Sequence, residues 1–203
     1  MSELPVQNHR KGRGLKLLVV LAVLLAAGVA GVGGVRVWQN SRAYHLAVVQ
    51  PGVLYRDGAK SEGQFAAALD EMKPRTVVSL VDAAEQSDAS KPQFAAESKA
   101  CEVRGVKLER IEVKLGGWPS SEDIRNFLAV VGEEKNRPVL VHCAQGVRRT
   151  AFFVAAYQMS VLGYDKEKAK NAILTFGHSD NTINDIRRFI DGYDGKMMTG
   201  SGQ

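Results

Sequence analysis

Cysteine is scarce in this chain of 203 residues, which contains only Cys101 and Cys143. Two cysteines do not make a disulfide framework, so the fold has to depend on a hydrophobic core. The two cysteines and four histidines show no metal-ligand spacing either, and we therefore expect no metal and no cofactor. Cys101 falls in a polar helical stretch, where it is either a structural residue or a resolving partner for Cys143.

An excess of one charge is also missing from most of the chain. The formal net charge is +5, but residues 1–36 contain five of the 27 basic residues and one of the 22 acidic residues. The remaining residues carry 22 basic and 21 acidic side chains, which is a net charge of +1. A nearly neutral domain has no basic face for a polyanion, so we predict no nucleic-acid partner.

Long apolar runs are absent except near the N-terminus, where residues 17–35 contain no charge. At about 1.5 Å per residue, a helix of this length just crosses a hydrocarbon core of about 30 Å. We expect residues 17–36 to form one transmembrane anchor of a single-pass membrane protein, with the basic tail of residues 1–16 in the cytoplasm. A cleaved signal peptide is the alternative, because small residues for cleavage occur within residues 25–30.

After this run the sequence predicts a linker at residues 37–44, one domain at residues 45–194 and a disordered tail at residues 195–203. Short β-type runs in the domain alternate with amphipathic helical patterns. The predicted strands are 46–49, 53–56, 76–81, 106–113 and the run that begins at 139, and the predicted helices are 61–72, 92–103, 120–135, 148–162, 165–176 and 182–193. Such alternation is typical of an α/β fold with a mostly parallel sheet flanked by helices, whose ligand site lies at the carboxyl ends of the strands.

One segment combines a strand, a loop and a helix with chemistry: Pro138-Val-Leu-Val-His-Cys-Ala-Gln-Gly-Val-Arg-Arg-Thr-Ala151. Backbone N–H groups at a helix start favour an anion, and the same field lowers the pKa of a thiol at the base of the loop, here Cys143. The guanidinium of Arg149 matches two phosphate oxygens at once. Gly146 lets the loop turn inward, and His142 is expected to orient the loop by hydrogen bonding.

The pattern His142-Cys143-x5-Arg149-Thr150, with Gly146 three residues after the cysteine, resembles the signature loop of the cysteine-dependent protein tyrosine and dual-specificity phosphatases. The resemblance continues upstream through residues 49–58 and 64–81 and covers about residues 45–193, as in compact bacterial and atypical dual-specificity members. It implies a three-layer protein-tyrosine-phosphatase-like fold.

The resemblance also implies site roles. Cys143 would be the nucleophile that forms a phosphocysteine, Arg149 would bind the phosphoryl group and the transition state, and Thr150 would assist hydrolysis. The residues between them would form the phosphate-binding loop, namely Ala144, Gln145, Gly146, Val147 and Arg148. Arg148 points either into the pocket, where it would favour substrates with several phosphates, or away along the helix.

The general acid of this family is usually an aspartate in a loop before the cysteine, and this sequence departs from that pattern. Ser120 stands where Trp118-Pro119 would lead to the aspartate. Asp82, Glu112 and Asp123 are weak candidates, and an enzyme that needs no acid is a further possibility. We expect hydrolysis of a phosphomonoester on a phosphorylated protein, small molecule or lipid; a pseudophosphatase that only binds phosphate and a rhodanese-like sulfurtransferase remain alternatives.

Overall fold

The computed structural model describes residues 42–194, together with Leu21 and Leu24, which are helical and exposed. The chain divides into two compact units, residues 1–40 and 41–203. Within the described residues, no helix combines the length and the apolar character needed to cross a membrane. Apart from those two leucines, the predicted tail, anchor and C-terminal tail lie outside the described residues, as does most of the linker, so these assignments stay predictions.

The second unit contains a sheet of five strands in the order β1-β2-β5-β3-β4. Its strands are β1 (Tyr44–Gln50), β2 (Leu54–Gly58), β3 (Thr76–Ser79), β4 (Lys107–Arg110) and β5 (Val139–Cys143). Only the edge strand β1 runs antiparallel to its neighbour, and the described strands β2 to β5 are parallel. The predicted α/β fold is therefore confirmed, with a mixed sheet, and β5 lies at its centre between β2 and β3.

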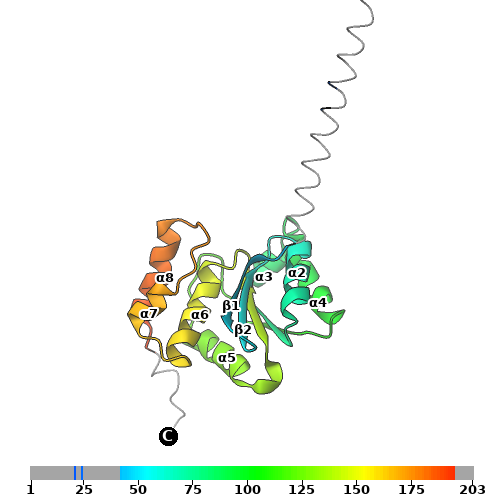
Figure 1. Ribbon diagram of the computed structural model, residues 1–203. Coiled ribbons are helices and arrows are strands. Elements are labelled where there is room, and N and C mark those ends of the chain that lie inside the picture. Colours follow the sequence, from blue (N-terminus) through cyan, green and yellow to red (C-terminus); the bar gives the residue numbers. More distant parts are fainter. Residues whose placement is uncertain (1–20, 22–23, 25–41, 195–203) are drawn as a thin grey trace, which may run out of the picture. The chain divides into compact units, whose positions relative to one another are not determined.

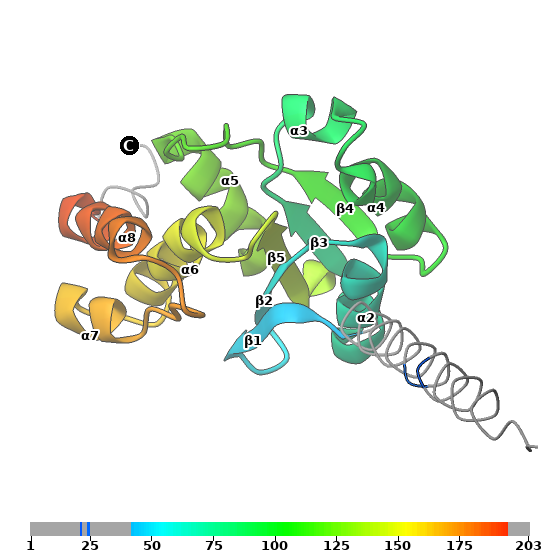
Figure 2. The ribbon, with the colours of Figure 1, turned by 90° about the horizontal axis from the view of Figure 1, so that it is seen from above.

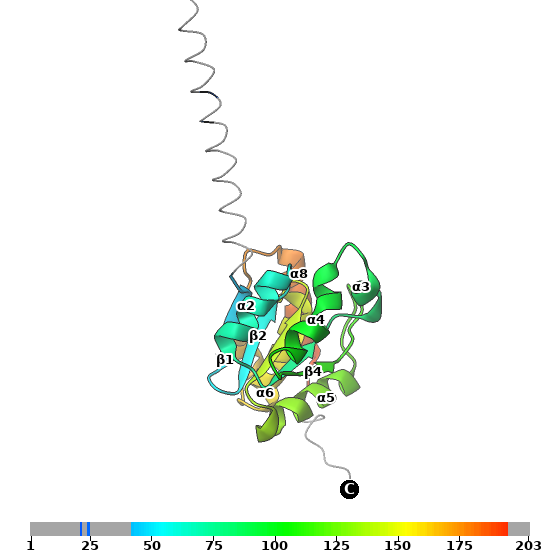
Figure 3. The ribbon, with the colours of Figure 1, turned by 90° about the vertical axis from the view of Figure 1, so that its right-hand side faces the viewer.

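Helices cover both faces of this sheet (Figures 1 and 2). One layer contains α2 (Glu62–Met72) and α4 (Pro92–Glu102), with the short α3 (Ala83–Ser87) packed beside α4. The other layer contains α5 (Ser121–Gly132), α6 (Arg148–Ser160), α7 (Lys166–Asn171) and α8 (Asp180–Gly192), and a 3-10 turn, η1 (Glu134–Asn136), follows α5. Figure 3 shows α2 and α4 in front of the strands.

The central strand divides the hydrophobic core because its side chains alternate between the two faces. Val139, Val141 and Cys143 face the cluster formed with α5, α6 and α8, whereas Leu140 belongs to the cluster under α2 and α4. Cys101 packs in that second cluster, and both cysteines are free thiols. The sheet lies between them, so the structure gives no support to Cys101 as a resolving partner.

Several elements differ from the sequence prediction. The strand expected over residues 106–113 ends at Arg110. The helix expected over residues 165–176 ends at Asn171, and Phe176 and Gly177 adopt left-handed backbone angles, with φ of 47° and 77°. The strand expected over residues 76–81 ends at Ser79. The short helix α3, which the sequence analysis missed, then begins because the Asp82 side chain caps the backbone N–H of Glu85.

Candidate active site

The segment singled out in the sequence forms the junction between the central strand and α6. β5 ends at Cys143, the loop follows, and α6 begins at Arg148. The residue that precedes the helix, Val147, has no side chain that can cap it, and no side-chain hydrogen bond is made there. Backbone N–H groups of the first helical turn are consequently left for an anion, in the field of the helix dipole.

The thiol of Cys143 lies at the base of this loop and is only 3% exposed. Its sulfur accepts hydrogen bonds from the backbone N–H of Gly146 and from the hydroxyl of Thr150, each at 3.2 Å. Burial alone would raise the pKa of Cys143, but the charge of Arg149 and these hydrogen bonds outweigh it and hold the pKa below the ordinary thiol value. The loop thus favours a thiolate.

The guanidinium of Arg149 is held by a clamp that the sequence analysis did not foresee. It forms a two-pronged ion pair with the carboxylate of Glu85, at 2.5 and 3.0 Å, and its NH1 also donates to the carbonyls of Leu80 and Val113. Burial lowers the pKa of Arg149, but the Glu85 hydrogen bonds reverse this and raise it overall. With both side chains 4% exposed, the fork keeps one orientation.

The loop also packs against the end of β2 so closely that two glycines are required. A Cβ added to Gly58 would lie 2.5 Å from the carbonyl carbon of Gln145, and one added to Gly146 would fall on the carbonyl of Asp57. Gly146 also has a φ of 65°, which side chains rarely tolerate. Its carbonyl accepts a hydrogen bond from the buried Arg56 at 2.5 Å.

Two ionisable groups of β2 are buried beneath the loop. Burial lowers the pKa of Arg56 to about 10. Burial also raises the pKa of Asp57 to about 8, and the negative charge of Cys143 adds to this rise. Asp57 is therefore mainly protonated at neutral pH, which avoids a second negative charge beside the thiolate.

His142 contacts the layer opposite to the cysteine loop. Its ring packs against Phe65, with 4.9 Å between ring centroids, and its Nε2 lies 3.5 Å from a carboxylate oxygen of Glu97. Burial lowers the pKa of His142 and so favours a neutral ring. The backbone of Cys143 interacts with this ring and opposes the lowering of its pKa, and the expected role of His142 in orienting the loop stays a prediction.

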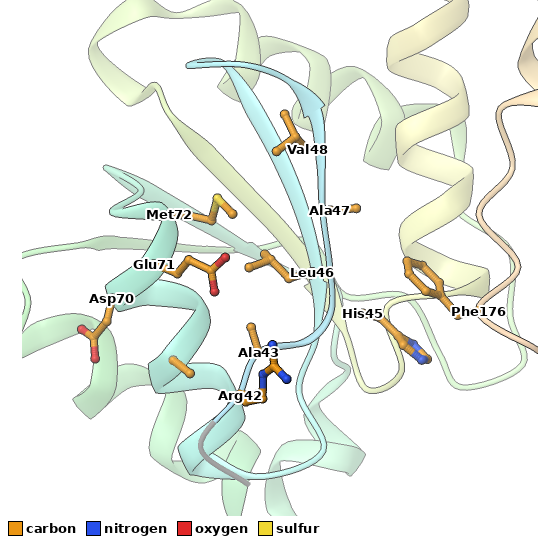
Figure 4. Close-up of a pocket in the computed structure, with 11 residues that line it drawn as sticks. Arg42, Ala43, His45, Leu46, Ala47, Val48, Asp70, Glu71, Met72 and Phe176 are labelled. Carbon is orange, nitrogen blue, oxygen red and sulfur yellow. The ribbon is translucent and has the colours of Figure 1, made fainter. Parts of the chain in front are cut away.

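Above Cys143 the structure has a pocket of about 330 Å³. The described residues that line it are Leu115, Gly116, Cys143, Ala144, Gln145, Val147, Arg148, Arg149, His178 and Thr182. A hollow of about 950 Å³ lies between β1 and α2 (Figure 4), but no residue of the cysteine loop lines it. The smaller pocket is therefore the candidate active site. Among residues 42–194, no cluster of three histidine, cysteine or carboxylate side chains is arranged to hold a metal ion.

Arg148 turns away from the centre of this pocket, the more ordinary of its two predicted orientations. Its Nε donates to Asp185 of α8 at 2.7 Å, and its NH1 donates to the carbonyl of Gly117 at 2.6 Å. The guanidinium also lies over the ring of Trp118, 5.3 Å from its centroid. Arg148 thus fastens the loop of residues 113–119 to α8.

The three candidate acids all accept hydrogen bonds from groups elsewhere in the fold, and none of them lines the pocket. Asp82 accepts hydrogen bonds from the backbone N–H of Glu85 and Leu115, at 2.8 and 2.9 Å. Glu112 accepts from the N–H of Ala83 at 3.2 Å and lies near Gln86. These bonds are structural, so neither carboxylate is aimed at a leaving group.

Asp123 is the N3 residue of a capping box at the start of α5. Its carboxylate accepts hydrogen bonds from the N–H and the hydroxyl of Ser120, at 2.7 and 2.8 Å, and the Ser120 hydroxyl accepts from the N–H of Asp123. Ser120, which stands where related loops carry aspartate, is therefore a helix cap. The described structure gives none of the three carboxylates the position of a general acid.

Asp82→Asn separates a structural role from a catalytic one. Hydrogen bonds from Glu85 and Leu115 lower the pKa of Asp82 below 3.8, so its carboxylate stabilises the fold above that pH and loses this effect as the pH falls through the folded pKa. We expect a stability loss of about 1 kcal/mol at pH 7 that disappears in strong acid. Urea unfolding across pH measures this, and a hundredfold loss of turnover in a folded variant would instead make Asp82 the acid.

Comparison with known proteins agrees with the geometry. A family model described as "DSP-PTPase phosphatase fused to NAD+ Kinase" matches residues 50–187. The dual specificity protein phosphatase TpbA of Pseudomonas aeruginosa PAO1 is 36% identical over 142 residues, which are 70% of this chain and 59% of TpbA. A probable chloroplastic NAD kinase 2 of Oryza sativa subsp. japonica is 22% identical over 122 residues, 60% of this chain and 12% of that protein. The chain thus spans less than two thirds of the length of each of these relatives.

Solved structures show the same fold. The catalytic core of Siw14 has a TM-score of 0.61 at 18% identity, and the match covers 77% of this chain and 89% of that one. Crystalline TpbA has a TM-score of 0.57 at 22% identity, with 78% and 94% covered. A cysteine-to-serine variant of TpbA has been solved in complex with pTyr. Because the family model covers most of the described domain, including the cysteine loop, the chain belongs to the DSP-PTPase phosphatase family.

Proposed function

We propose that this chain hydrolyses phosphate monoesters through a phosphocysteine on Cys143. The observation that carries the proposal is the arrangement around the sulfur, which receives hydrogen bonds from Gly146 and Thr150 beside the clamped guanidinium of Arg149. A thiolate held beside a phosphate-binding cradle is the arrangement that nucleophilic phosphoryl transfer requires.

The reaction has two steps. The thiolate of Cys143 attacks phosphorus, the S–P bond forms, and the P–O bond to the leaving group breaks, with a proton added to the departing oxygen. Water then attacks phosphorus, the P–S bond breaks, and phosphate leaves with the thiolate restored. Arg149 and the loop N–H groups bind the phosphoryl oxygens in both steps, and the Thr150 hydroxyl stabilises the sulfur as it departs.

The pocket favours a substrate with one phosphoryl group on an apolar or aromatic carrier, such as phosphotyrosine. Its two described cations are each paired with a carboxylate, Arg148 with Asp185 and Arg149 with Glu85. A substrate with several phosphates would need further positive charge. The complex of TpbA with pTyr supports this preference, whereas a similar structure from S. cerevisiae is described as a PP-IP phosphatase.

Thr150→Ala tests the covalent intermediate. Loss of a hydrogen bond to a charged group costs about 1.5–3 kcal/mol, so we expect breakdown of the phosphocysteine to slow by about 10- to 100-fold. With an aryl phosphate under reducing conditions, acid quenching and mass spectrometry should find the variant phosphorylated on Cys143, and Thr150→Ser should behave like the wild type.

Two outcomes would reject the proposal. Phosphate binding without turnover or any phosphoenzyme would identify a binding module instead. A persulfide on Cys143 after reaction with thiosulfate, without aryl phosphate hydrolysis, would identify a sulfurtransferase. Vesicles that contain phosphoinositides, compared with a phosphotyrosine peptide, test the substrate preference.

A further inference from the structure

The pocket above Cys143 lacks a carboxylic acid among its described lining residues, although an alkoxide or phenoxide leaving group needs a proton. Arginine does not release a proton near neutrality, and Cys143 acts as the thiolate. The hydroxyl of Thr182 is too weak an acid. The one remaining side chain in the described lining of a type that commonly serves as general acid and base is His178.

His178 is held at the pocket by the irregular segment between α7 and α8. A turn closes there, with the backbone N–H of His178 donating to the carbonyl of Thr175 at 2.9 Å. Phe176 and Gly177 have left-handed backbones, a conformation that is costly for phenylalanine and that the surrounding contacts must hold. This segment therefore has a defined conformation at the pocket rim.

A second histidine connects this segment to the phosphate-binding loop. Figure 4 shows the rings of His45 and Phe176 side by side, next to β1. The two rings stack with 4.3 Å between centroids and an interplanar angle of 11°. The Nδ1 of His45 forms a 2.8 Å hydrogen bond with the carbonyl of Gln145, and the ring of His178 meets that of His45 edge-on at 5.8 Å. The contacts run from Gln145 through His45 to the segment that carries His178.

The charges around His178 come from four elements. The cysteine loop and α6 contribute Cys143, Arg148 and Arg149, which line the same pocket. β1 contributes His45, whose pKa burial lowers, so that it is mainly neutral at neutral pH, and α8 begins nearby with Asp180. The cations Arg56 and Lys60 act on His45, and the guanidinium of Arg56 lies 5.4 Å from the centroid of the Phe176 ring.

We propose that His178 is the general acid and base of the phosphatase reaction. In the first step its imidazolium gives a proton to the leaving-group oxygen while the P–O bond breaks and the S–P bond forms. In the second step the neutral imidazole takes a proton from the attacking water while the P–S bond breaks. The proton balance closes over one turnover, and no further reactant is needed.

This inference depends on the proposed function, so the test separates the two. Its probes are 4-nitrophenyl phosphate, whose leaving group departs without help, and phenyl phosphate, whose leaving group needs the proton. For His178→Gln we expect kcat/KM, which reports the first step, to change little with the first substrate and to fall by about 10²- to 10³-fold with the second. Breakdown of the phosphocysteine should slow to the same extent with both substrates, because that step uses His178 as the base. When the reaction of His178→Gln with 4-nitrophenyl phosphate is quenched, the phosphocysteine should still be detected.

His45→Gln is the matched control, because His45 contacts the ring of His178 but does not line the pocket. If His45→Gln weakens the support of the cysteine loop, turnover of both substrates should fall by the same factor. The wild-type enzyme provides a second readout: kcat/KM for phenyl phosphate should fall with rising pH as the acid loses its proton, and this limb should be absent in His178→Gln.

The outcomes are distinct. Equal losses in kcat/KM for both substrates, or no loss in kcat/KM for phenyl phosphate, would overturn the role of His178. If His178→Gln does not fold, the wild-type pH profile decides, since a limb confined to the carboxylic-acid range would overturn the proposal as well. An inactive wild-type protein would instead reject the proposed function.

Discussion

Cys143→Ser is expected to abolish turnover of aryl phosphates while binding of phosphate analogues is retained. A serine hydroxyl has a far higher pKa than a thiol, and the hydrogen bonds from Gly146 and Thr150 are not strong enough to ionise it. We expect kcat to fall by on the order of 10⁴-fold or more, which corresponds to about 5.5 kcal/mol of transition-state stabilisation. Steady-state hydrolysis under reducing conditions measures the loss.

Binding should survive for a structural reason. Arg149 and the N–H groups of the loop that receive the phosphoryl oxygens do not depend on the sulfur, and the variant no longer places a thiolate beside a dianion. Calorimetry with tungstate should therefore give an affinity equal to or higher than that of the wild type. Turnover above a tenth of the wild-type value would place the nucleophile elsewhere.

Cys101→Ser is the control for loss of a buried thiol. Cys101 belongs to α4, on the other face of the sheet; it is 1% exposed, and burial raises the pKa of its thiol to about 11. This thiol stays protonated and unreactive. The variant should unfold at a lower urea concentration, because the serine hydroxyl is buried without a hydrogen-bond partner. Its turnover should stay unchanged.

The proximity of Cys143 to the start of the helix that carries Arg149 could be predicted from sequence because this geometry is local. Cys143 and Arg149 lie six residues apart, and a strand, a tight loop and a helix start fix their separation with little help from the rest of the chain. The clamp on Arg149 has no comparable local pattern in the sequence. Glu85 lies 64 residues away, on a five-residue helix without an apolar pattern.

The candidate acids show the opposite limit of sequence reasoning. Asp82 is a candidate for its place just past a strand and Glu112 for its sequence separation from Cys143, but sequence spacing does not show which hydrogen bonds a carboxylate has already made. The partner that occupies Asp82 is the N–H of Leu115, 33 residues away. Asp123 was more predictable, since a Ser-x-x-Asp capping box is a local pattern that the structure contains.

Periodicity also located most helices but failed at the end of α7. The apolar spacing from Asp165 to Phe176 suits a longer helix, whereas Phe176 instead turns to stack on His45. A tertiary contact therefore overrides the helical pattern, and it brings His178 to the pocket. The sequence pattern assigns no role to His178, because the position of this residue depends on such tertiary contacts.

Arg149→Lys should lower kcat/KM by on the order of 10³-fold, although the positive charge is kept. The guanidinium of Arg149 holds Glu85 with two nitrogens and donates to Leu80 and Val113, and we expect its remaining N–H groups to bind the phosphoryl oxygens. A lysine ammonium has no fork, so it satisfies either Glu85 or the phosphate. The loss should be larger in kcat than in KM, because the fork matches the transition state best.

The same substitution should change the nucleophile. Arg149 lowers the pKa of Cys143, so a less well placed cation should let that pKa rise, and the pH at which iodoacetamide alkylation is half-maximal should increase.

Glu85→Gln is the matched variant: it keeps hydrogen bonding to Arg149 but removes the charge, and it should cost less turnover than Arg149→Lys. If the two effects are independent, the double variant will lose the product of the single factors; if Glu85 acts by holding Arg149, as the clamp indicates, the double variant should be no worse than Arg149→Lys alone. Retention of kcat/KM within tenfold by Arg149→Lys would show that another group binds the phosphoryl oxygens.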